Sequence, residues 1–284
     1  LERNPSWFNG PEPWARVHYR IVSNDGARTA ALLAGDVDII EQVPTSDLAR
    51  LRRDQRVTVP SIPSLRTVYI VPDYGRTGGD PEVTDNAGQP LPANPFLDVR
   101  VRRALSMAIN RQAIADQVME GAATATAQWL PQGAFGYDTT VQPRAYDPEG
   151  AKRLLAEAGF PEGFRLTITS PNDRWPNDSR ITQAVAQMWT RIGVRPQVTG
   201  YPWTGFVPRR MRFEYPIQLA AWGSSTGEAS NFLANVVATR DRSRLTGANN
   251  NGRYSSPFFD DITARGSGTL DAERREAIWH EAER

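Results

Sequence analysis

Helix and strand patterns alternate along this chain, and this alternation constrains its fold more than any other feature. The signal is strongest in the middle, where a capping aspartate, a first-turn proline and a terminating glycine bracket a helix over residues 147–159. Residues 165–170 then read as a strand, and apolar side chains recur on one face of a helix over residues 178–193. Another strand follows from Val194. Strands and helices in this order form βαβ units, so the pattern predicts an α/β fold.

The same rhythm extends over the rest of the chain. It predicts strands at residues 16–22, 37–40, 57–59, 67–71 and 216–222, and helices at 24–35, 45–51, 98–109, 110–121, 228–239 and 271–284. Between residues 72 and 95 the composition changes to Gly, Pro, Asp and Asn with little periodicity. A loop of this length is unusual inside a compact domain. We therefore expect separate α/β bodies over residues 14–72 and 96–284, joined by a crossing loop at 73–95.

Composition excludes several classes of protein. The 284 residues carry 33 basic and 32 acidic side chains without a basic run, so nothing points to a nucleic-acid partner. The absence of cysteine excludes disulfides, zinc–thiolate sites and cysteine nucleophiles, but it leaves the cellular compartment undecided. No stretch approaches the ~20 apolar residues of a membrane helix, and the first residues lack the layout of a signal peptide. The chain opens in a Pro/Gly-rich segment and stops inside a predicted helix, so we expect a fragment of a longer protein.

Several long segments, in order, resemble the extracellular solute-binding protein family 5, which includes dipeptide, oligopeptide and nickel binders of ABC importers. They are NPSWFNG at 4, ARTAALLAGDVDIIEQVP at 27, NPFLDVRVRRALSMAINRQAI at 94, YDPEGAKRLLAEAGFPEGF at 146 and RYSSPFFDDI at 253. The resemblance implies a two-lobed, periplasmic-binding-protein-like (class II) fold with one discontinuous lobe. Residues 1–72 would then belong to part of the first lobe, and residues 96–284 to a second lobe truncated at its C-terminal end. Half of the binding cleft would lie outside this chain.

The resemblance also implies a function. A family member captures a peptide-like or other small polar solute between its lobes and presents it to a membrane permease. We expect a monomer without catalytic activity or cofactor, located in the periplasm or lipid-anchored at the cell surface. A sensory or scaffold role on the same fold remains an alternative. Adjacent genes for a permease and an ATPase would favour import over that role.

Ligand pockets in open α/β folds form at the loops beyond the carboxyl ends of strands, and the loop at 223–227 meets that description. The alternative is a tight strand-to-helix turn with capping serines, and each tryptophan is equally typical of a core. The candidate ligand-binding residues are Trp222, Ser224, Ser225, Thr226 and Glu228 in and beside this loop, Tyr69 near the presumed hinge, Trp203 as an apolar wall, and Asn172, Asn250 and Tyr254 in two further loops.

Position 225 departs from the peptide-binding members that the chain resembles. Those proteins carry an aspartate three residues after the tryptophan, where it holds the ammonium group of the ligand, and Ser225 stands here. A neutral hydroxyl cannot offset the desolvation of an ammonium group in a closed cleft. Glu228 is three residues further on and either substitutes for the aspartate or caps the next helix. We therefore expect a modified peptide, an opine-like conjugate or a neutral or anionic solute.

A hydrolase is the competing hypothesis, because Gly223, Ser225 and Gly227 match the G-x-S-x-G pattern between a strand and a helix. That chemistry requires a histidine base held by a carboxylate. His280, the only histidine downstream, lies inside a predicted charged helix, and His18 lies on an early predicted strand. Paired carboxylates elsewhere in the chain lack histidines, which favours solvated turns over a metal or acid–base site. We therefore expect no catalytic residue and no metal ligand.

Overall fold

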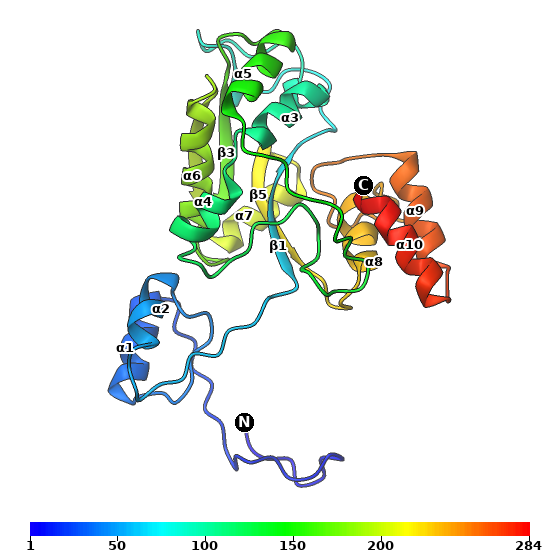
Figure 1. Cartoon of the computed structure of the whole chain (residues 1–284). Helices are drawn as coiled ribbons and strands as arrows, with labels where there is room; N and C mark the ends of the chain where they lie inside the picture. The colour runs from blue at the N-terminus through cyan, green and yellow to red at the C-terminus, as the bar shows by residue number, and fades with distance from the viewer. The chain divides into compact units, whose positions relative to one another are not determined.

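The computed structural model describes residues 1–284 and divides them into two compact units, Leu1–Val59 and Pro60–Arg284. The first unit contains two helices, α1 (Asp25–Ala34) and α2 (Thr45–Leu51), drawn in blue in Figure 1. The Asn24 side chain accepts a hydrogen bond from the Ala27 amide, and Gly35 closes α1 with a φ of 80°. Both features agree with the predicted cap and stop.

Three predicted strands of the first unit, at residues 16–22, 37–40 and 57–59, are wrong. Residues 15–17 make only a short backbone pairing with residues 1–3, including 2.8 Å from the Val17 amide to the Leu1 carbonyl. The apolar side chains after it are exposed, and Ile21 keeps 90% of its surface. Alternating residues form a strand only where a neighbouring strand completes the hydrogen bonding and a surface covers the apolar face. The first unit offers neither to residues 18–22.

The second unit is built on a five-stranded mixed sheet. Its strands are β1 (Arg66–Pro72), β2 (Val83–Thr84), β3 (Arg165–Pro171), β4 (Arg195–Tyr201) and β5 (Ile217–Gly223). β3 pairs in parallel with β4 along its whole length and with β5 over two residues. β1 runs antiparallel to β5, and β2 runs antiparallel to β3. The carboxyl ends of β3, β4 and β5 therefore lie at one edge of the sheet, beside the amino end of β1.

The expected separation of residues 14–72 from residues 96–284 is wrong for β1. Every residue of β1 pairs with β5, from Arg66 opposite Gly223 to Pro72 opposite Ile217, so both segments belong to one sheet. The segment 73–95 is not a bare crossing loop either, because Val83 and Leu91 are buried in the main core. The Gly and Pro residues of this segment are typical of turns, and they do not mark a boundary between two α/β bodies. The lobe of the whole protein to which residues 1–72 belong stays a prediction.

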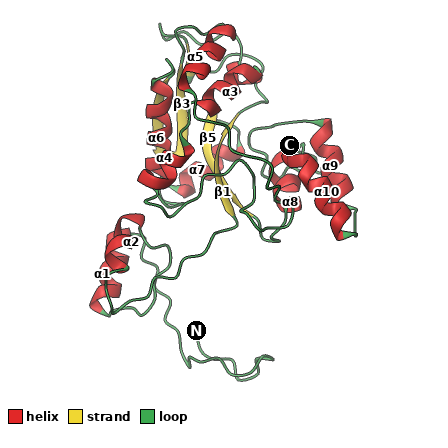
Figure 2. Ribbon diagram, in the orientation of Figure 1, coloured by secondary structure: helices red, strands yellow, loops and turns green.

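Helices cover the sheet and form a second group beside it, as Figure 2 shows. In chain order they are α3 (Val99–Met107), α4 (Arg111–Ala113), α5 (Pro148–Glu157), α6 (Asp178–Thr190), α7 (Trp203–Met211), α8 (Ala229–Phe232), α9 (Pro257–Ser267) and α10 (Ala272–Glu283). A 3₁₀ turn at Pro95–Leu97 precedes α3, and π-helical turns continue α4 over Ile114–Val118 and α8 over Leu233–Val237. None of these helices combines the length and the apolar character needed to cross a membrane.

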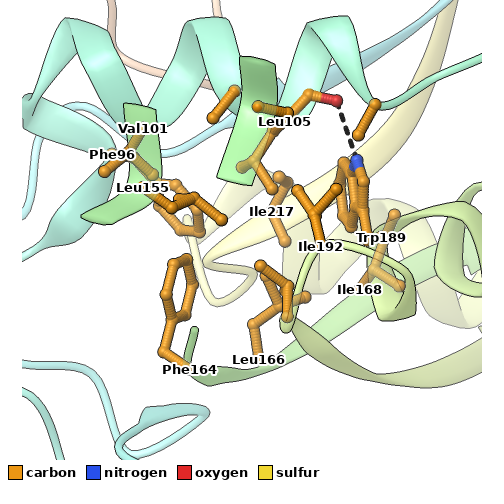
Figure 3. Packing of buried hydrophobic residues seen from close by; sticks show 14 of the residues in the cluster. Phe96, Val101, Leu105, Leu155, Phe164, Leu166, Ile168, Trp189, Ile192 and Ile217 are labelled. Atoms are coloured by element: carbon orange, nitrogen blue, oxygen red, sulfur yellow. Dashed lines mark hydrogen bonds between the residues drawn. The ribbon is translucent and has the colours of Figure 1, made fainter. Parts of the chain in front are cut away.

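The main core lies between the sheet and helices α3, α5 and α6. Figure 3 shows Trp189 of α6 packed among apolar side chains of the helices and the strands, including Ile168 of β3 and Ile217 of β5. The Trp189 indole Nε1 donates a 2.9 Å hydrogen bond to the Leu105 carbonyl of α3. A second cluster, around Trp279, holds α8, α9 and α10 together. Helices α3, α5 and α6 therefore stabilise the sheet by packing against it.

Candidate functional site

A cleft of about 310 Å³ lies at the carboxyl edge of the sheet, wholly within the second unit. Its lining comes from five separate parts of the chain: the start of β1, the loop after β3, helix α7 after β4, the end of β5, and Asn249 in a later loop. Parallel strands bring these segments together because their carboxyl ends share one edge. The side chains that give the cleft its chemistry are Trp175, Trp203, Trp222, Arg66, Arg174 and Arg210.

The aromatic wall of the cleft is fixed by packing beneath it. The rings of Trp175 and Trp203 meet edge to face with centroids 5.5 Å apart, and Trp203 stacks on Phe206 at 5.8 Å. Phe206 is fully buried and stacks in turn on Tyr215 at 5.0 Å. At the end of β5, the Trp222 indole donates a 2.7 Å hydrogen bond to the Asn231 side chain. These contacts restrict the rotamers of the rings, so flat apolar surfaces are presented in defined positions.

Two aspartates near the cleft are engaged with the backbone. The Asp173 carboxylate accepts a 2.7 Å hydrogen bond from the Trp203 amide and so ties the loop after β3 to the start of α7. The Asp178 carboxylate accepts hydrogen bonds from the Arg174 and Trp175 amides, both at 3.1 Å. Burial raises the pKa of Asp178, an effect that these backbone amides oppose. Both carboxylates therefore serve to position the lining residues.

The electrostatic character of the cleft is cationic. Arg66, Arg174 and Arg210 line it, and no aspartate or glutamate does. The Arg174 guanidinium lies 5.1 Å from the centre of the Trp203 ring, and the Arg210 guanidinium lies 6.0 Å from it. None of the three arginines has a carboxylate within ion-pair distance. The cleft thus offers flat apolar walls together with positive charge.

Of the ten candidate residues, Trp203 and Trp222 line this cleft. Asn249, the neighbour of the candidate Asn250, also lines it. Asn250 itself is buried and organises its own loop, donating to the Ala238 carbonyl at 3.0 Å and to the Tyr254 carbonyl at 2.7 Å. Tyr254 packs edge to face against Tyr74.

The remaining candidates do not line the cleft. Tyr69 lies on β1 with its ring 5.6 Å from that of Phe232, and burial raises its pKa. Asn172 is exposed just after β3. A ligand-binding role for these residues stays a prediction. Trp175 and all three arginines were not predicted from the sequence; arginine is frequent throughout this chain, and no local pattern marks these three.

The loop at 223–227 is a hydrogen-bonded strand-to-helix turn. Ser224 is buried, and its hydroxyl donates to the Glu228 carbonyl at 3.1 Å. Ser225 and Thr226 are exposed, and the Ser225 hydroxyl accepts a 3.3 Å hydrogen bond from Asn231. The Glu228 carboxylate binds the Ser230 hydroxyl and lies 3.5 Å from Arg275. It does not cap α8.

The geometry of Ser225 does not support a nucleophile. Its hydroxyl is paired with the Asn231 amide, whereas His280 lies within α10 and its Nε2 has no hydrogen-bond partner. A serine nucleophile needs a histidine within hydrogen-bond reach to accept its proton. No group of three or more histidine or carboxylate side chains is placed to hold a metal ion either.

We expect a fluorophosphonate probe to leave Ser225 unlabelled, because no base is present to take its proton. Intact-mass spectrometry before and after treatment is the measurement, and a known serine hydrolase treated in parallel is the positive control. Stoichiometric labelling that disappears in Ser225→Ala would instead establish an activated serine.

Comparison with known proteins identifies the family and agrees with the fold. Residues 1–244 match the family model of the bacterial extracellular solute-binding proteins, family 5 Middle. Heme-binding protein A of Haemophilus influenzae is 29% identical over 98% of this chain and 48% of its own length. The dipeptide-binding protein of Escherichia coli is 25% identical over 93% of this chain and 46% of its own length. The chain therefore spans about half the length of the curated relatives it matches.

Solved structures show the same fold. The oligopeptide-binding protein AppA from Bacillus subtilis, in complex with a nonapeptide, superposes with a TM-score of 0.78 at 19% identity, over 100% of this chain and 55% of that protein. The predicted α/β, class II periplasmic-binding-protein-like fold and the family resemblance are thereby confirmed. The family is one of binding proteins, not of enzymes. This chain belongs to the bacterial extracellular solute-binding proteins of family 5.

Proposed function

We propose that the whole protein is the solute-binding component of an ABC importer, and that the cleft beside β5 forms one wall of its ligand site. The observation that carries this proposal is the cleft itself, which places packed tryptophan faces and polar groups at the carboxyl ends of the parallel strands β3, β4 and β5. Open α/β folds bind ligands at this edge. A second lobe closes over the bound solute, and the closed form is delivered to a membrane permease.

The finer parts of the proposal follow from family membership. The protein works as a monomer, in the periplasm or on a lipid anchor at the cell surface. Its solute is peptide-like or another small polar molecule. Among the relatives, one is named for heme and another for dipeptides, and the Bacillus subtilis protein holds a nonapeptide. Family membership is thus compatible with many kinds of solute. The residues of this chain restrict which kinds can bind.

The loop at 223–227 argues against a ligand held by its free amino terminus. Ser225 offers a hydroxyl that is already bonded to Asn231, and Glu228 is already paired with Arg275 and Ser230. A desolvated ammonium group needs a facing carboxylate to offset the lost hydration, which is worth several kcal/mol. We therefore propose a modified peptide, an opine-like conjugate or a neutral or anionic solute.

Native mass spectrometry of the gently purified whole protein tests the function directly. We expect a mass above that of the polypeptide, corresponding to a captured small molecule. Trp222→Ala should weaken capture at least tenfold, about 1.4 kcal/mol, because it removes one flat wall of the cleft. Phe258→Ala removes a half-exposed ring from α9, away from the cleft, and should not change capture. No captured mass, together with no ligand-induced thermal shift from any solute class, would contradict the proposed function.

The specificity is tested by thermal shift with unmodified dipeptides and tripeptides against amino-blocked and anionic analogues. We expect the unmodified peptides to bind more weakly than the analogues. Submicromolar binding of unmodified peptides that persists in Glu228→Gln would show that other groups satisfy the ammonium, and it would contradict the proposed class of solute.

A further inference from the structure

Arg210, in helix α7, is a buried charge without a counter-ion. Its side chain keeps only 9% of its surface exposed, and it is the only arginine among the buried residues of the chain. No carboxylate lies within ion-pair distance of it, and its Nε atom is buried without a hydrogen-bond partner. Burial lowers the pKa of the guanidinium. Arginine nevertheless stays protonated in proteins, so the charge remains and its desolvation is uncompensated.

The contacts that Arg210 does make are too weak to offset that cost. Its guanidinium lies 6.0 Å from the Trp203 ring, where a cation–π interaction contributes about 0.5–2 kcal/mol. Removing an ion from water costs several kcal/mol. Arg174 lies over the same ring at 5.1 Å, so two cations share one indole and repel each other. An anion bound in the cleft near these guanidinium groups would offset both effects.

One buried charge elsewhere in the second unit is paired. Asp73 keeps 2% of its surface exposed and is bound by both Arg76 and Arg253. Around Arg210, in contrast, the carboxylates of Asp173 and Asp178 are turned to backbone amides. Arg210 therefore differs from Asp73, because no ion pair compensates its charge.

We propose that the cleft is an oxyanion site, in which Arg210, assisted by Arg174 and Arg66, binds the acidic group of the solute. Two N–H groups of a guanidinium match two oxygens of a carboxylate or phosphate, which makes arginine suited to this task. Trp203 and Trp222 then receive a flat apolar part of the same molecule. The solute class is an organic acid with a planar apolar portion. This inference rests on the proposed function, because it names the ligand chemistry of the same cleft.

The test uses the whole protein with three probes, benzoate, its neutral counterpart benzamide, and inorganic phosphate, each titrated at millimolar concentration by calorimetry. We expect benzoate to bind and benzamide to bind at least tenfold more weakly. Benzoate stronger than phosphate would identify a carboxylate as the preferred oxyanion, and the reverse order would identify a phosphate. Benzamide equal to benzoate, or neither anion binding, would overturn the proposal.

Arg210→Met keeps the apolar stem of the side chain and removes its charge. It should weaken binding of the preferred anion at least tenfold, whereas Arg210→Lys should retain part of the affinity. Arg195→Gln is the matched control, because it removes an exposed arginine at the opposite, amino end of β4. Arg174→Met, at an exposed position of the cleft, provides a second variant should Arg210→Met fail to fold.

Thermal unfolding without ligand separates a binding role of Arg210 from a structural one. An unpartnered buried charge destabilises the unliganded protein, so Arg210→Met should leave the midpoint temperature of unfolding unchanged or raise it. A fall in the midpoint together with unchanged anion affinity would mean that Arg210 is structural, and the proposal would be wrong. A captured solute that is neutral or cationic would also overturn the oxyanion site, yet it would leave the importer function standing.

Discussion

Replacing Trp189 by alanine should lower the free energy of unfolding by about 3–5 kcal/mol, the range for deleting a fully buried large side chain. Trp189 retains 1% of its surface and lies at the centre of the main core, between α6, α3 and the sheet (Figure 3). Its indole also satisfies the Leu105 carbonyl, one of the last four carbonyls of α3, which lack partners within the helix. Alanine would leave both a cavity and an unpaired buried acceptor.

Urea unfolding of the whole protein, followed by circular dichroism, measures this effect. Trp189→Phe keeps a six-membered aromatic ring and loses the hydrogen bond and the five-membered part of the indole, so we expect a smaller loss of about 1–3 kcal/mol. Phe258→Ala, at a ring that is 51% exposed, is the control and should change stability by less than about 1 kcal/mol. Equal stability of Trp189→Ala and the wild type would mean that the packing of α6 on α3 does not support the fold.

Replacing Asp73 by asparagine should cost about 3 kcal/mol, the lower end of the range for breaking a buried ion pair. Asp73 follows directly after β1, and its carboxylate lies 2.9 Å from the Arg253 Nε and 3.1 Å from the Arg76 Nε. Both arginines are partly exposed, at 30% and 28%, so water can solvate some of the charge that the variant leaves unpaired. The expected loss of stability therefore lies at the lower end of the range.

The matched control for Asp73→Asn is Asp261→Asn. Asp261 pairs with Arg265 on the surface of α9, where both side chains are about half exposed. Exposed pairs contribute about 0–1 kcal/mol, so this variant should be nearly neutral. The same urea experiment compares the two. If both variants lost the same small amount, the Asp73 cluster would not connect β1 with the loop at 249–254 in the way that its contacts suggest.

Local signals in the sequence predicted most helices correctly. Asp147 accepts a hydrogen bond from the Gly150 amide and Gly159 has a φ of 93°, as the cap and the stop require. Asp98 and Asn110 likewise cap the two predicted helices in series. Caps act within three or four residues, so their outcome does not depend on distant parts of the chain. Helices α7 and α9 were not predicted, and α7 contains Pro208, which usually argues against a helix.

Local signals in the sequence also predicted part of the candidate site. The loop at 223–227 was correctly placed between a strand and a helix, and Trp203 and Trp222 do line the cleft. The cationic side of the cleft was not predicted. Arg66, Arg174 and Arg210 lie far apart in the sequence and come together only where β1, β3 and β5 pair. No local pattern distinguishes them from the many exposed arginines.

The sequence by itself determined the α/β class, the capped helices and the family, because periodicity, capping and long ordered segments can be read without knowing which residues meet. Tertiary structure alone decided three things: that β1 joins the sheet of the second unit, that residues 16–22 do not form a strand, and that Arg210 is buried without a carboxylate. Strand pairing and charge compensation depend on partners distant in the chain. A pattern of residues shows what a segment is able to form, and the available partner decides what it does form.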